Sequence, residues 1–118
     1  MGLNNKEKRT RRKKRIRKYV FGTAIKPRLS VYRSNKEIYA QLINDISKTT
    51  LVSASSRDKS LSNFKGKKTE KSFIVGEILA NYAKKLNIQS IVFDRNGFIY
   101  HGRIKALAEG ARKGGLKF

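Results

Sequence analysis

A run of basic residues near the start of the chain limits where a folded core can lie. Between Lys6 and Lys18 the only apolar residue is Ile16, and the first 28 residues carry twelve Lys and Arg against a single acid. A segment with so little apolar surface cannot offset the entropy lost on ordering, so alone it is expected to be disordered or a frayed helix. We therefore divide the chain into a basic extension, residues 1–22, and a folded domain, residues 23–118.

The charge of the whole chain predicts a polyanionic partner. Its 118 residues carry 29 Lys and Arg against 8 Asp and Glu, a formal net charge of +21. Repulsion at this charge destabilises a compact chain unless a partner neutralises it. Nucleic acid is the first candidate and an anionic membrane surface the second. A nuclear-import signal over Arg11–Arg15 and a merely solvated surface are two further interpretations.

Three short strands are predicted after the basic extension. In Arg28–Arg33 and Glu37–Ile43, apolar and polar residues alternate with the period of two that is typical of half-buried strands. The polar segment Ser34–Lys36 between them predicts a hairpin turn, and Thr49–Ala54 predicts a third strand. The segment 55–68 is polar, basic and without a period, and we expect a loop there.

Two helices and one further strand are predicted in the second half of the chain. After Thr69, a candidate N-cap, apolar residues recur at the three- and four-residue spacing of a helix: Val75, Ile78, Leu79, Tyr82 and Leu86. Ser90–Phe93 indicates a strand covered on both sides, reached by a parallel βαβ crossover. Asn-Gly then predicts a turn, and Arg103–Lys113 predicts the second helix, ended by Gly114-Gly115. The residues expected on its inner face are Ile104, Leu107, Ala108 and Ala111.

The residues suited to catalysis are too few and too scattered for an enzyme. With one His and no Cys, a zinc site of ordinary ligands is excluded. Asp94 and His101 could meet as a dyad across a turn, but a turn-capping Asp and a His that bonds RNA or backbone is the simpler interpretation. Gly66–Thr69 lacks the first glycine and the hydroxyl residue of a phosphate-binding loop. We expect no enzymatic activity, cofactor, metal or small-molecule substrate.

Three motifs resemble those of one ribosomal family. Arg33–Gln41 resembles its Arg-Ser/Thr-x-x-x-Ile-Tyr-Ala-Gln hairpin, and Phe93–Ala108, with Asp-Arg-Asn-Gly-Phe and Tyr-His-Gly-Arg, resembles its C-terminal signature. Ala111–Phe118 is similar to its Ala-Arg-x-x-Gly-Leu-x-Phe ending. By these residues the chain is identified as a member of the family of large-subunit ribosomal protein eighteen, in its short bacterial or organellar form.

The resemblance implies a fold, a location and partners. It implies an α/β protein, a single β3-α-β-α domain with a mixed sheet, preceded by a basic N-terminal extension. It also implies binding to 5S ribosomal RNA and its anchoring, with 23S ribosomal RNA and other proteins, in the central protuberance of a cytoplasmic or organellar ribosome. RNA contacts are expected in Arg9–Lys18, Arg33–Gln41 and Arg95–Arg103, whereas the loop 57–68 has no close match.

Basic side chains would set the position of the RNA through its phosphates, and polar or aromatic groups would add selectivity. A free nucleic-acid chaperone, a peripheral membrane protein and an enzyme are the alternatives, and near-stoichiometric co-sedimentation with large subunits would separate the chaperone from a ribosomal component. The candidate RNA-binding residues are Lys8, Arg9, Arg11, Arg12, Lys13, Lys14, Arg15, Arg17, Lys18, Arg33, Asn35, Lys36, Tyr39, Gln41, Arg95, Asn96, His101 and Arg103.

Overall fold

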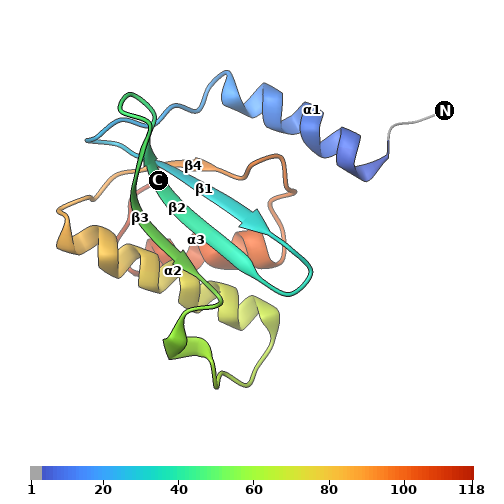
Figure 1. Cartoon of the computed structure of the whole chain (residues 1–118), viewed down its shortest axis with the longest axis vertical. Coiled ribbons are helices and arrows are strands. Elements are labelled where there is room, and N and C mark those ends of the chain that lie inside the picture. Colours follow the sequence, from blue (N-terminus) through green and yellow to red (C-terminus); the bar gives the residue numbers. More distant parts are fainter. Residues whose placement is uncertain (1–3) are drawn as a thin grey trace.

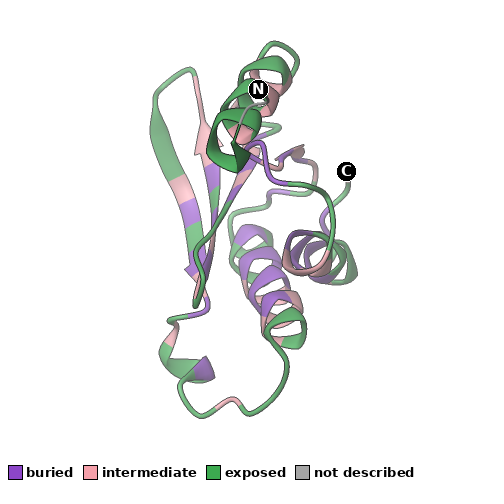
Figure 2. Ribbon diagram, turned by 90° about the vertical axis from the view of Figure 1, so that its right-hand side faces the viewer, coloured by how far each residue is buried: buried purple, intermediate pink, exposed green. Residues whose placement is uncertain are grey.

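The computed structural model describes residues 4–118, and its folded part has two layers. A four-stranded sheet forms one layer, and two helices pack over one of its faces (Figure 1; Figure 2). Among residues 4–118, no helix layer covers the opposite face of the sheet. In chain order the elements are α1 (Asn5–Arg17), β1 (Arg28–Arg33), β2 (Ile38–Asn44), β3 (Thr49–Ser55), the 3₁₀ turn η1 (Lys59–Leu61), α2 (Lys68–Lys85), β4 (Val92–Asp94) and α3 (Arg103–Lys113).

The sheet is mixed, as the family resemblance implies. Its order is β3-β2-β1-β4, with β1 and β2 antiparallel, β2 and β3 antiparallel, and β1 and β4 parallel. Helix α2 therefore carries the chain across the sheet, from β3 at one edge to β4 at the other. The first three strands confirm the predicted alternation to within a residue.

The last strand differs from its prediction in position and in burial. It begins at Val92, whereas Ser90 makes only an isolated bridge to Lys117. Val92 and Phe93 are half-buried, so the prediction of a strand covered on both sides was wrong. The physical reason is that α2 and α3 cover one face of the sheet, which leaves the other side of this edge strand partly open in the part of the chain that the structure describes.

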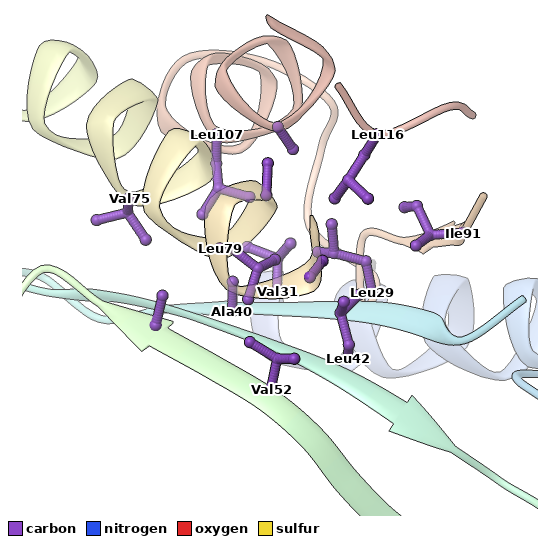
Figure 3. Close-up of a cluster of buried hydrophobic side chains, with 14 of the residues drawn as sticks. Leu29, Val31, Ala40, Leu42, Val52, Val75, Leu79, Ile91, Leu107 and Leu116 are labelled. Carbon is purple, nitrogen blue, oxygen red and sulfur yellow. The ribbon is translucent and has the colours of Figure 1, made fainter. Parts of the chain in front are cut away.

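The hydrophobic core lies between the sheet and the two helices (Figure 3). Alternate residues of β1 and β2 point into it, Leu29 and Val31 from β1 and Ala40 and Leu42 from β2, and all four are fully buried. They meet the buried faces of the helices, where the largest apolar residues include Val75, Leu79, Ile104 and Leu107.

The buried face of α2 is made largely of small residues. Tyr82 and Leu86 belong to the apolar series whose spacing predicted an amphipathic helix, but they are 37% and 54% exposed and do not lie on its buried face. The two helices approach closely because Gly76 lies against the backbone of α3: a Cβ there would overlap the Leu107 carbonyl oxygen and lie 2.7 Å from the Ala111 nitrogen. The other small buried residues of α2 are Ser72, Ala80 and Ala83.

The ends of the helices are set by local hydrogen bonds. Helix α2 begins at Lys68, with Lys67 as its N-cap, so the prediction of Thr69 as N-cap was wrong. The carboxylate of Glu70 accepts a hydrogen bond from the Lys67 N–H (3.4 Å), which removes the need for a hydroxyl at the N-cap. Helix α3 has the predicted bounds, and it ends at Gly114 with Gly115 at φ 112°.

The basic extension contains α1, which lies outside the two layers (Figure 1). None of its residues is buried, and it is mostly exposed in Figure 2. That residues 1–22 form a unit separate from the domain stays a prediction. Among residues 4–118, no helix combines the length and the apolar character that crossing a membrane requires.

Candidate nucleic-acid interface

The three segments expected to bind RNA lie against one another in the folded chain. Arg9 of α1 donates to the Asn96 carbonyl oxygen (3.3 Å) and Arg12 to that of Gly97 (2.8 Å), which joins the basic extension to the turn after β4. Arg103, at the start of α3, donates to the Ser34 carbonyl oxygen (2.8 Å) of the β1–β2 hairpin. Residues more than sixty positions apart thus form one continuous basic surface.

Helix α1 has an inward and an outward face. Arg9, Arg12, Ile16 and Arg17 are half-buried, and their spacing of three, four and one places them along one side of the helix. The aliphatic part of an arginine side chain can pack on the domain while its guanidinium stays in contact with water or with hydrogen-bond acceptors. The exposed basic residues of α1 and of its C-cap are Lys6, Lys8, Arg11, Lys13, Lys14, Arg15 and Lys18.

An aromatic ring connects α1 to the end of β1. The guanidinium carbon of Arg9 lies 4.1 Å from the centre of the Phe98 ring, and that of Arg33 lies 5.4 Å from it. Tyr32 packs edge-on against the same ring, with 5.8 Å between centres. Such cation–π contacts favour a cation over a ring face and hold the two arginines at defined places.

The turn between β4 and Phe98 has a shape that requires glycine. Asn96 and Gly97 have φ of 54° and 80°, and Asp94 caps the turn by accepting a hydrogen bond from the Asn96 N–H (2.8 Å). A Cβ on Gly97 would overlap the Arg9 carbonyl oxygen, so α1 itself is the group that approaches this glycine closely. The Asp94 carboxylate accepts hydrogen bonds from the Asn96 N–H and the Arg28 guanidinium, and among the described residues it forms no dyad with His101.

A second group of basic residues surrounds the tip of the β1–β2 hairpin. Lys68 donates to the Asn35 carbonyl oxygen (2.6 Å), beside the contact of Arg103 with Ser34. Partial burial and the neighbouring Arg33 guanidinium lower the pKa of Arg103. The Arg33 and Arg103 guanidinium groups repel each other, and an anion beside them would relieve that repulsion.

The open face of the sheet adds aromatic and polar groups next to these basic residues. Tyr32 and Tyr39 are cross-strand partners with ring centres 6.4 Å apart, and Tyr32 is 48% exposed. Gln41 is exposed on β2, two residues from Tyr39 along the same face. Exposed aromatic rings of this kind can stack on unpaired bases, and the amide can hydrogen-bond to them.

Most of the predicted RNA-binding residues are accessible, with one clear exception. Asn96 is only 9% exposed, which leaves little of its side chain for a ligand. His101 is exposed, while Arg95 is half-buried and donates to the Phe98 carbonyl oxygen (3.0 Å). Their roles in binding stay predictions.

Sequence reasoning missed Lys68 and Lys71, which line one small cleft with Lys36 and Arg103. The chain pattern shows a basic loop there but cannot show that its end returns to the hairpin.

An open groove lies between α1 and the end of β1. Five of its lining residues are basic and none is acidic. The lining residues are Asn5, Lys6, Lys8, Arg9, Arg12, Arg33, Phe98 and Ile99.

These features define a class of protein. Within residues 4–118 no group of three or more His, Asp or Glu could hold a metal ion, and the functional surface consists of cations, amides and aromatic rings. A small α/β domain with this surface belongs to the class of basic proteins whose exposed cations, amides and aromatic rings suit contact with a polyanion.

The comparisons with known proteins name the family within that class. A family model described as ribosomal L18 of archaea, bacteria, mitochondria and chloroplasts matches residues 3–118. Large ribosomal subunit protein uL18 of Clostridium perfringens (strain SM101) is 55% identical over 115 residues, covering 98% of this chain and 96% of the relative. That of Lactobacillus johnsonii is 57% identical over 110 residues (93% and 92%), and that of Staphylococcus saprophyticus 50% over 116 residues (98% and 97%).

The chain belongs to the ribosomal L18 family. It is a structural component of the large ribosomal subunit, associated with ribosomal RNA, and it is not an enzyme. The family resemblance deduced from the hairpin and the C-terminal motif is thereby confirmed.

Proposed function

We propose that this protein binds 5S ribosomal RNA and helps attach it to 23S ribosomal RNA in the central protuberance of the large subunit, next to other proteins there, in the bacterial cytoplasm. The observation that carries the proposal is the joining of α1, the hairpin and the turn after β4 into one basic surface. Folded RNA presents phosphates on more than one side of a groove, and a surface built from three segments can contact several of them at once.

Two groups of residues contribute differently to RNA binding, one to affinity and one to selectivity. The outward residues of α1, such as Arg11 and Arg15, carry charge without a partner among the described carboxylates, and they supply affinity through counterion release. Residues fixed on the domain, His101 and Arg103, supply selectivity, because a donor held on a rigid frame discriminates between shapes better than one on a mobile chain.

A competition experiment tests the proposal. The full-length protein is titrated with labelled 5S ribosomal RNA, and unlabelled 5S RNA or a transfer RNA of similar size competes at one fixed salt concentration. We expect 5S RNA to compete more strongly. Equal competition by the two RNAs would refute the 5S assignment and favour a general nucleic-acid chaperone.

Substitutions then separate affinity from selectivity. Arg11→Gln with Arg15→Gln should weaken binding of both RNAs alike, whereas Arg103→Ala should weaken 5S RNA more, by the ~1.5–3 kcal/mol of a hydrogen bond to a charged group. Lys85→Gln, at the far end of α2, removes the same charge as a control and should change neither. Equal losses on both RNAs for Arg103→Ala would show that this residue contributes charge only.

A further inference from the structure

An acidic residue stands at the point where the basic extension joins the domain. Asp45, in the turn after β2, accepts hydrogen bonds from the Gly22 N–H (2.7 Å) and from Nε and Nη2 of Arg28 (2.9 and 3.1 Å). Its own N–H donates to the Gly22 carbonyl oxygen (2.9 Å). Gly22 and Asp45 are therefore joined by two hydrogen bonds in opposite directions.

The surroundings of this junction leave it little freedom. Gly22 is buried, and a Cβ there would overlap the Arg28 nitrogen and the Ile43 carbonyl oxygen, so the chain passes close to the end of the β1–β2 pair where these two residues are partners. Arg28 also donates to Asp94 (2.7 Å), whose side chain is fully buried. The side chain of Asp45 is 12% exposed, and Arg17 of α1 lies 3.7 Å from it.

The last turn of α1 is tied to the same place. Arg17 donates to the Val20 carbonyl oxygen (2.7 Å), which closes the chain between the end of the helix and Gly22. The path of the chain from α1 into β1 is thus held at Gly22 by Asp45 and at Arg17 by both Val20 and Asp45. We call the group Arg17, Gly22, Arg28, Asp45 and Asp94 the Asp45 cluster.

We propose that Asp45 is a positioning residue for RNA binding: it fixes the direction in which α1 leaves the domain, and so holds the basic side chains of α1 in register with the basic residues of the hairpin and the turn after β4. The inference rests on the proposed function for its RNA component. Without the cluster, α1 keeps its contacts from Arg9 and Arg12 to the turn after β4 but loses the attachment of its last turn, so it samples more directions. The apparent affinity then falls in proportion to the fraction of molecules in the binding orientation.

Charge alone predicts that loss of the Asp45 carboxylate strengthens RNA binding, whereas a positioning role predicts that it weakens binding. A carboxylate near a cationic surface weakens its attraction for phosphates, so replacing Asp45 by Asn should strengthen RNA binding if only charge matters. If Asp45 acts by positioning α1, the same substitution weakens binding although it raises the net charge by one.

The experiment compares two substitutions of equal charge in the full-length chain. Asp45→Asn should weaken binding of 5S RNA by about fivefold, as expected when only about a fifth of the molecules hold α1 in the binding orientation. Glu109→Gln is the control, because the native Glu109 carboxylate on α3 is half-exposed and lies 3.9 Å from the Lys105 amine. This substitution should leave the affinity for 5S RNA unchanged or slightly higher. Affinity of Asp45→Asn equal to or above that of the native chain would overturn the inference.

A measurement without RNA separates this inference from the proposed function. Since the chain has no cysteine, spin labels can be placed at Lys14→Cys on α1 and Thr50→Cys on β3, both exposed positions. The distance distribution should be narrow in the native background and broad with Asp45→Asn. A narrow distribution in both overturns the positioning role, whereas broadening without any preference for 5S RNA would refute the proposed function only.

Two further variants serve as a control for unfolding and as a test of whether Asp45 acts on RNA binding through α1. If Asp45→Asn shows no cooperative melting, Asp45→Glu is used in the same two assays, because it keeps the charge but moves the carboxylate away from the Gly22 N–H. With Arg11→Gln and Arg15→Gln already present, Asp45→Asn should add less than twofold further loss. A full additional loss would show that Asp45 does not act through α1.

Discussion

Replacing Gly76 by alanine should destabilise the protein, although alanine is the better helix former. In the middle of α2 the change gains about 1 kcal/mol of helix propensity. Against it, the new methyl group would overlap the Leu107 carbonyl oxygen and lie 2.7 Å from the Ala111 nitrogen, and both atoms belong to the backbone of α3. Backbone cannot rotate away as a side chain does, so α3 must shift and open the core between the two helices.

The size of the loss follows from these two opposed effects. Overpacking a close contact costs about 1–3 kcal/mol, and a clash with backbone lies at the upper end of that range. After subtracting the gain of about 1 kcal/mol in helix propensity, we expect a net loss of roughly 2 kcal/mol. At a few degrees per kcal/mol for a domain of this size, Tm should fall by about 8 °C. Urea and thermal unfolding followed by circular dichroism measure both, with Asn81→Ala on the exposed side of α2 as a control for propensity. An unchanged or raised midpoint for Gly76→Ala would refute the close contact.

Three further predictions concern the basic surface and its attachment. If about eight phosphates are neutralised, log K for 5S RNA should fall against log salt with a slope of roughly −6 to −7, and a slope shallower than about −2 would contradict the electrostatic account. Gly97→Ala should speed hydrogen exchange in α1, whereas Gly102→Ala, which also has positive φ but open space around it, should not. The hydrogen bond from Arg28 lowers the pKa of Asp45, whose carboxylate faces Arg17 and Arg28, with Asp94 on the far side of Arg28. The stability that ionised Asp45 contributes is therefore present above about pH 4 and is lost as the pH falls below it. Acid titration of unfolding should therefore show a weaker pH dependence for Asp45→Asn than for the native chain.

Elements with a regular apolar pattern could be predicted from the sequence. Leu29 and Val31 alternate with polar residues because one face of β1 meets the core, and α3 has the predicted bounds because a glycine pair ends it. The buried face of α2 could not be predicted in the same way. Glycine and alanine carry little hydrophobic signal, yet they are buried there because two helix backbones come into contact, whereas Tyr82 gives a strong signal and lies outside.

The candidate site was predictable in its segments and not in its internal contacts. Basic residues mark α1 clearly, but nothing in their order separates Arg9 and Arg12, which hold the helix to the domain, from Arg11 and Arg15, which point outward. The pairing of Arg28 with Asp94 was hidden because 66 residues separate the partners. Local patterns carry no information about such distant ion pairs.

The pairing of β1 with β4 sets an order of events during synthesis. Arg28 is made early, but its strand partner Val92 and its ion-pair partner Asp94 follow more than sixty residues later. Until then β1 has only β2 beside it, and α1 has no turn to rest on, since Asn96 and Gly97 do not yet exist. A growing chain thus presents its basic helix unattached until Asn96 and Gly97 have been made, and it completes its sheet only after Asp94 has been added.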